Sequence, residues 1–162
     1  MKRAKTHRIT FGKLSIENFK SVGSKVEFDW ADHFGLNYIF GTNKDIEGTS
    51  NGSGKSCIFV DAILFAIFGK TLKNTNNRFI SNRAMVDKKV DTKVSLLFEI
   101  NGVKYEVVST MSRYQASVST SLFCEGEDVS KSTAKETRYH IEQELLKCNY
   151  ELFRNCVILS SM

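Results

Sequence analysis

The chain has 162 residues, of which 41% are hydrophobic and 25% are charged, and its formal net charge is +5 at pH 7. This composition is ordinary for a soluble protein with one domain that is large enough to bury a core. No apolar run approaches the roughly eighteen residues of a membrane span, and no apolar signal core follows the basic N-terminus. The four cysteines lack zinc-type spacing, which predicts reduced thiols in a cytosolic protein. The small basic excess is compatible with nucleic acid without demonstrating it.

Three strands are predicted in the first quarter of the chain. Residues 8–20 alternate weakly between apolar and polar side chains, and Lys25–Trp30 alternate more regularly, which is typical of half-buried strands. The apolar run Leu36–Phe40 has the length of a third strand.

The motif Asn51-Gly52-Ser53-Gly54-Lys55-Ser56 follows this third strand and precedes a second apolar run, Ile58–Phe68. Because that run contains no glycine or proline, it predicts a buried helix from Ser56 to about Phe68, with Gly69 as its C-terminal cap. A strand, a glycine-rich turn and a helix in this order are typical of a phosphate-binding loop.

Each residue type in this loop suits a polyphosphate. Glycines let the backbone turn its N–H groups toward an anion, and the N-terminus of the helix adds further free donors. Lys55 supplies a mobile positive charge, and the hydroxyl of Ser56 is a small, hard ligand for Mg²⁺. The strict pattern requires glycine where the chain has Thr49, so the loop is lengthened from Gly41 at the strand end. The alternative is a Gly/Ser-rich hairpin loop that contains a lysine, but the flanking strand and helix favour the phosphate loop.

A basic stretch and an antiparallel region follow the helix. Residues 70–92 are polar and basic, which predicts a surface loop with one or two short turns, either a contact for a nucleic acid backbone or a solvated face. The dipeptide Asn101-Gly102 between two alternating runs is a strong hairpin signal. The alternation continues to Cys124, which predicts either a third strand or a third and a fourth strand.

The C-terminal part is predicted to be helical. Thr133 and Glu136 form a capping box at the start of a helix, and Phe153–Leu159 would return to the core. We therefore expect one unit, residues 1–162, made of a phosphate-loop core (about 8–90), an antiparallel lobe (about 92–125) and a helix with a return to the core (133–162).

The sequence predicts no catalytic residue in this chain. The three histidines have no ligand-type neighbours, and no base accompanies Ser53 or Ser56 for nucleophilic chemistry. Nucleotide hydrolysis at a phosphate loop also needs an acidic residue at a strand end to hold Mg²⁺. Glu99 precedes a hairpin and Asp61 lies inside the predicted helix, so neither fits that role.

With these residues placed, the chain resembles the N-terminal ATPase half of the SbcC-type double-strand-break repair enzymes, in particular the large subunit of phage recombination endonucleases. These enzymes are relatives of the SMC, RecF and RecN proteins. The resemblance rests on Leu14–Ser21, Asn51–Ser56, Asp61–Gly69 and Tyr150–Leu159. It implies an α/β fold, the N-terminal lobe of a P-loop ABC-type ATPase, with a mixed sheet, a buried helix after the phosphate loop and an antiparallel β-lobe.

The resemblance also implies a site for ATP and Mg²⁺. Lys20 and Ser21 would lie near the base and phosphates, Ser56 would hold Mg²⁺, and the backbone of Cys57 would touch the α-phosphate. The segment Ile80–Asn82 would pass near the nucleotide. The nucleotide-binding residues that it implies are Lys20, Ser21, Asn51, Gly52, Ser53, Gly54, Lys55, Ser56 and Cys57.

The chain departs from the family pattern in three places. Nine residues separate Gly41 from Asn51, where the family has one, and a surface insertion of this length costs little entropy. The family's glutamine, which bridges Mg²⁺ and the attacking water, falls at about Ser161, whose shorter side chain is the weaker metal candidate. The chain ends at Met162, where the family would begin a coiled coil that leads to a C-terminal lobe.

The function that the resemblance implies is an ATP-binding lobe that gates a partner nuclease at double-stranded DNA ends. The expected partners are an SbcD-type metal-dependent nuclease subunit, the C-terminal lobe of the same ATPase, a second ATPase head and double-stranded DNA, in the cytoplasm (the host's, if the protein is phage-encoded) and without a membrane. We expect ATP hydrolysis only when the C-terminal lobe and a second head complete the site. The alternatives are a nucleotide-responsive DNA-binding module that uses residues 70–89, and an SMC- or RecF-type scaffold ATPase without a nuclease.

Overall fold

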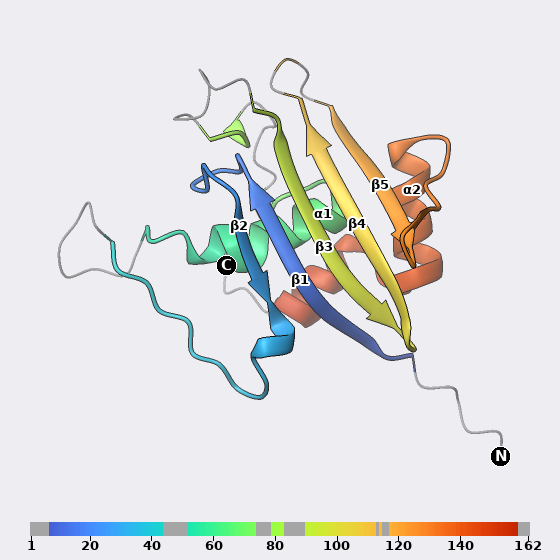
Figure 1. Ribbon diagram of the computed structural model, residues 1–162, viewed down its shortest axis with the longest axis horizontal. Coiled ribbons are helices and arrows are strands. Elements are labelled where there is room, and N and C mark those ends of the chain that lie inside the picture. Colours follow the sequence, from blue (N-terminus) through green and yellow to red (C-terminus); the bar gives the residue numbers. More distant parts are fainter. Residues whose placement is uncertain are drawn as a thin grey trace.

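A six-stranded antiparallel sheet forms the centre of the computed structural model (Figure 1), which describes residues 7–43, 52–73, 79–82, 90–112, 114 and 117–158. The strand order is β2-β1-β3-β4-β5-β6. The strands are β1 (Ile9–Glu17), β2 (Val26–Asp29), β3 (Thr92–Ile100), β4 (Val103–Met111), β5 (Val118–Cys124) and β6 (Glu127–Asp128).

The helices lie behind one face of this sheet in Figure 1, and all seven residues of α1 are buried. Alternate side chains of β3 and β4 pack against α1, because successive residues of a strand point to opposite faces. The opposite face carries polar side chains such as Lys93 and Ser95. The helical segments are η1 (Trp30–Asp32), η2 (Cys57–Asp61) continuing into α1 (Ala62–Phe68), α2 (Ala134–His140) continuing into η5 (Ile141–Leu146), and α3 (Tyr150–Phe153) continuing into η6 (Arg154–Ile158).

Three local predictions are confirmed. Asn101 and Gly102 both have positive φ angles, 52° and 91°, and join β3 to β4 as the hairpin pattern requires. Gly69 has a φ of 66° and ends α1 in the left-handed conformation. The hydroxyl of Thr133 accepts a hydrogen bond from the Glu136 backbone amide at 3.1 Å, which is the N-cap half of the predicted capping box.

The predicted strand Leu36–Phe40 is wrong. These residues have no regular secondary structure, and Leu36 and Tyr38 are 103% and 89% exposed. A strand needs a neighbour for its backbone hydrogen bonds, and no neighbouring strand lies beside this run within the described residues.

The predicted mixed sheet is also not observed in the described part of the chain, where every strand pair is antiparallel. Strand β1 pairs with β3, so the expected core and the expected antiparallel lobe share one sheet. The third and fourth strands expected before Cys124 are a single strand, β5, and β6 follows it. No helix among the described residues has the length and apolar character that crossing a membrane requires.

Candidate nucleotide-binding site

The predicted phosphate-binding motif precedes the buried helix, as expected, but the run before it, Leu36–Phe40, is not the strand that the sequence predicts. Gly52 and Gly54 have φ angles of 79° and 84°, which are strained for other residues and which turn the loop back on itself. The Ile58 amide donates to the Gly54 carbonyl at 3.1 Å, so the helix begins directly at the loop. Lys55 and Ser56 therefore lie in its first turn, where free N–H groups favour an anion.

The two ends of the inserted stretch lie against each other. A β-carbon placed on Gly41 would be 2.4 Å from Oγ of Ser53, and one placed on Gly52 would be 3.1 Å from Nδ2 of Asn43. The residues before and after the insertion therefore lie close together despite its length. Residues 44–50 of the insertion, and Asn51 after it, lie outside the described residues.

Two further predicted nucleotide-binding residues make contacts at this loop: Lys55, which belongs to it, and Ser21, which comes from the turn after β1. The ammonium group of Lys55 donates to Oγ of Ser53 at 3.2 Å, which holds the lysine over the loop. A β-carbon on Gly54 would lie 3.2 Å from Oγ of Ser21, so the turn that contains Ser21 packs on the loop. The Cys57 thiol donates to the Phe19 carbonyl at 3.6 Å and strengthens the same contact.

The turn Asn18–Ser21 is fixed by a distant segment that includes Asn82. The Asn82 amide donates to Oδ1 of Asn18 at 2.9 Å, and Nδ2 of Asn82 donates to the Lys20 carbonyl at 2.7 Å. The Lys20 amide donates to the Ile80 carbonyl at 2.5 Å. Ile80–Asn82 therefore lies behind the turn, and Asn82 supports a turn in which Asn18 and Lys20 both have a φ of 50°.

Lys20 itself points to a residue to which the sequence assigned no role in the site. Its ammonium group lies 2.5 Å from Oδ2 of Asp61, which is only 7% exposed. The other carboxylate oxygen of Asp61 accepts a hydrogen bond from the Leu72 amide at 2.8 Å. The sequence did carry a signal for this ion pair, because Asp61 is the single carboxylate within the apolar run Ile58–Phe68. A charge that is buried with such a run needs a partner.

Magnesium would depend on Ser56 and the nucleotide. Among the described residues no group of three or more His, Cys, Asp and Glu side chains could hold a metal ion. Mg²⁺ at a phosphate site commonly takes one or two protein ligands and completes its shell with phosphates and water, so the exposed Ser56 hydroxyl fits. Ser161, the second metal candidate, lies outside the described residues.

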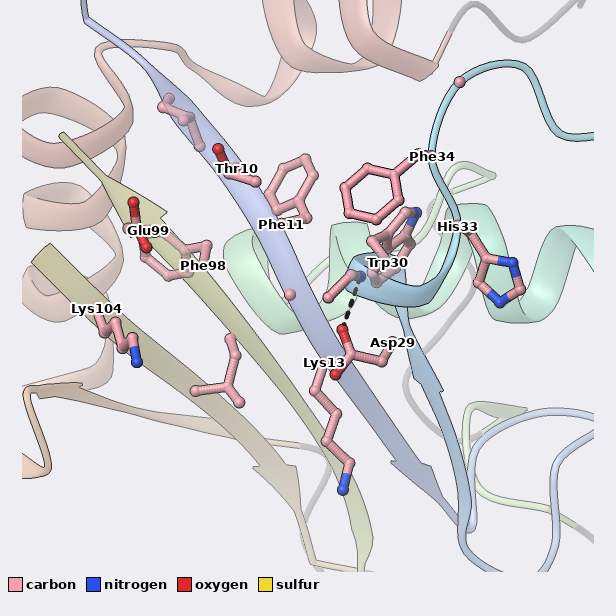
Figure 2. Close-up of a pocket in the computed structure, with 15 residues that line it drawn as sticks. Thr10, Phe11, Lys13, Asp29, Trp30, His33, Phe34, Phe98, Glu99 and Lys104 are labelled. Atoms are coloured by element: carbon pink, nitrogen blue, oxygen red, sulfur yellow. Dashed lines mark hydrogen bonds between the residues drawn. The ribbon is translucent and has the colours of Figure 1, made fainter. Parts of the chain in front are cut away.

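A hollow lies at the other end of β1 and is separate from this site. Figure 2 shows this pocket, about 660 Å³, with Phe11, Trp30 and Phe34 among its lining residues. None of the predicted nucleotide-binding residues lines it. The aromatic hollow is therefore not part of the predicted nucleotide site.

A family model described as an AAA domain matches residues 13–162. The matched region contains the Asn18–Ser21 turn, the phosphate loop and Asp61. No curated protein matches the chain.

Proposed function

Because the chain belongs to the AAA domain family, a P-loop ATPase family that includes SMC- and SbcC-like proteins, we propose that it is the ATP-binding N-terminal lobe of an SbcC-like DNA repair or recombination ATPase. The observation behind this proposal is the closed phosphate loop. Gly41 lies against Ser53 and Lys55, and Ser21 lies against a left-handed Gly54, although a long insertion interrupts the motif.

Each part of the loop has a separate task in binding ATP. The backbone N–H groups of Gly52–Ser56 would cradle the phosphates, since free amides at a helix N-terminus attract anions. Lys55, which hydrogen-bonds to Ser53, would turn its ammonium group to the outer phosphates. The Ser56 hydroxyl would contribute to a Mg²⁺ ion that neutralises phosphate charge when bound.

The exposed apolar run around Leu36 supports the proposal that another protein surface covers it in the working enzyme. Phe34, Leu36 and Tyr38 are each nearly fully exposed, and an apolar run of this kind marks a protein interface. We propose that the C-terminal lobe of the same ATPase covers it and supplies the acidic residue for hydrolysis, with a second head closing over the nucleotide. We propose the SbcD-type nuclease and double-stranded DNA as further partners on the basis of the sequence resemblance alone.

The first test is binding of a fluorescent ATP analogue with Mg²⁺ to the purified chain. Lys55→Ala should weaken binding at least about tenfold, because a charge-assisted contact to phosphate is lost. Lys93→Ala, on the open face of the sheet, is the matched control and should bind normally. Measured ATP turnover by this chain, abolished by Lys55→Ala, would contradict the proposal that the lobe alone is incomplete.

The alternatives predict different behaviour. Co-purification of the full-length ATPase with a nuclease subunit would separate the proposed enzyme from an SMC- or RecF-type scaffold. Salt-sensitive DNA binding by the isolated chain, lost on charge reversal within residues 70–89, would favour a nucleotide-responsive DNA-binding module.

A further inference from the structure

The carboxylate of Asp61 joins two segments that are remote from each other in the sequence. Its Oδ2 atom lies 2.5 Å from the Lys20 ammonium group, and its Oδ1 atom accepts the Leu72 amide at 2.8 Å. Both oxygens are thus used, which is what an almost fully buried carboxylate requires.

On one side, this carboxylate acts on the rim of the phosphate loop. Lys20 has a φ of 50°, a conformation that a lysine adopts only when its surroundings impose it. The next residue, Ser21, packs its hydroxyl on the Gly54 position. Holding the Lys20 side chain from the helix therefore holds Ser21 against the loop.

On the other side, the same carboxylate is connected to α3 through Leu72 and Thr71. Leu72 follows Thr71, whose carbonyl accepts a hydrogen bond from the Tyr150 hydroxyl at 3.0 Å. The Tyr150 ring packs edge-on against Phe68 at the end of α1, with 5.6 Å between ring centroids. The segment that Asp61 fixes is thereby attached to the first residue of α3.

We propose that Asp61 is a positioning residue of the nucleotide site, an inference that rests on the proposed ATP-binding function. Asp61 holds Lys20, and through it the Asn18–Ser21 turn, against the phosphate loop, and it joins that turn to α3. Lys20 thus acts on the nucleotide through the turn, with its ammonium group paired to Asp61, and it is not a phosphate ligand.

The test is a double-mutant cycle on the whole chain. Asp61→Asn keeps the shape of the side chain and removes its charge. Lys20→Gln removes the positive charge of the pair, and Lys20 is the more exposed of the two partners. Each change should weaken binding of the fluorescent ATP analogue about tenfold, and the double variant should bind no worse than either single one, because all three remove the same interaction. Lys20→Arg keeps the positive charge and should retain most of the affinity of the unaltered chain.

The surface ion pair of Lys13 and Glu27, with 2.7 Å between charged atoms, is the matched control. Lys13→Gln and Glu27→Gln should change the affinity by less than about twofold, since exposed pairs contribute little. All affinities are measured below the unfolding transition of each variant, so that lost binding is distinguished from lost folding.

Three results would overturn the proposal. Additive losses, or a loss with Lys20→Gln but not with Asp61→Asn, would make Lys20 a direct phosphate ligand. Normal binding by Asp61→Asn, with binding still dependent on Lys55, would leave the proposed function intact and remove only the role of Asp61. Absence of Lys55-dependent binding by the unaltered chain would overturn both.

Discussion

Gly41 and Ser53 approach so closely that no side chain fits between them. A β-carbon on Gly41 would lie 2.4 Å from Oγ and 2.8 Å from Cβ of Ser53. The φ angle of Gly41 is not positive, so glycine is required here by the close approach and not by the backbone conformation. This contact closes the base of the lengthened phosphate loop.

Gly41→Ala should therefore disturb the loop directly. The added methyl group must displace Ser53, which also holds Lys55, so we expect ATP affinity to fall about tenfold or more, about 1.4 kcal/mol for each factor of ten. Thermal stability should change little, because residues 41–43 lie outside the regular elements of the fold. A fluorescent ATP analogue measures the affinity, and thermal unfolding followed by circular dichroism measures the stability.

Two variants check the cause. Gly12→Ala adds the same methyl group at a position where its nearest neighbour would be 3.5 Å away, so nucleotide affinity should stay unchanged. Adding Ser53→Gly to Gly41→Ala removes the clashing side chain and should recover part of the lost affinity. A Gly41→Ala variant that binds ATP normally would show that the loop tolerates movement at this contact.

Ser109 is expected to contribute to stability through the end of α1. Its hydroxyl donates to the Ala66 carbonyl at 2.8 Å, one of the carbonyls without an intrahelical partner at a helix C-terminus. Ser109→Ala should lower the free energy of unfolding by about 1–3 kcal/mol, and the melting temperature by about 2–4 °C for each kcal/mol. Ser95→Ala on the open face of β3 is the control, and equal stability of the two variants would contradict the prediction.

Glu27 should titrate far below the ordinary range for a glutamate. Hydrogen bonds from Lys13 and then Lys25 lower the pKa of the Glu27 carboxyl from 4.5 to about 2. Because the folded-state pKa is depressed, any stabilisation is complete above pH 4.5 and is lost as the pH falls toward 2. NMR titration should give a midpoint near 2 that rises in Lys13→Gln and in high salt. A midpoint at the ordinary value, unaffected by Lys13→Gln, would contradict this.

The exposed run provides a prediction about assembly. Leu36→Ser and Tyr38→Ser should alter the free energy of unfolding by no more than about 0.5 kcal/mol, because both side chains are already in solvent. The same variants should lose association with a polypeptide that carries the C-terminal lobe, measured by co-purification. Tyr139→Ser, at another exposed aromatic position on α2, should associate normally. Normal association by the Leu36 and Tyr38 variants would place the interface elsewhere.

The sequence alone was sufficient where a few neighbouring residues decide the conformation. Asn101-Gly102, the Gly69 cap and the Thr133 cap were all predictable, because the sign of a φ angle or a hydrogen bond across three residues determines each of them. The positive φ angles of Gly52 and Gly54 and the helix that follows them were predictable in the same way, because local residue types and a long apolar run indicate both. Phosphate binding by this loop stays a prediction.

Only the tertiary structure decided how distant segments complete the site. Leu36–Phe40 has the composition of a strand, yet a strand forms only beside a partner, and none pairs with it among the described residues. The contacts of Asp61 with Lys20, of Asn82 with Asn18 and of Gly41 with Ser53 depend on how the sheet and α1 bring separate segments together. Such contacts leave no periodic pattern in a single sequence, because they depend on distances in space and not on spacing along the chain.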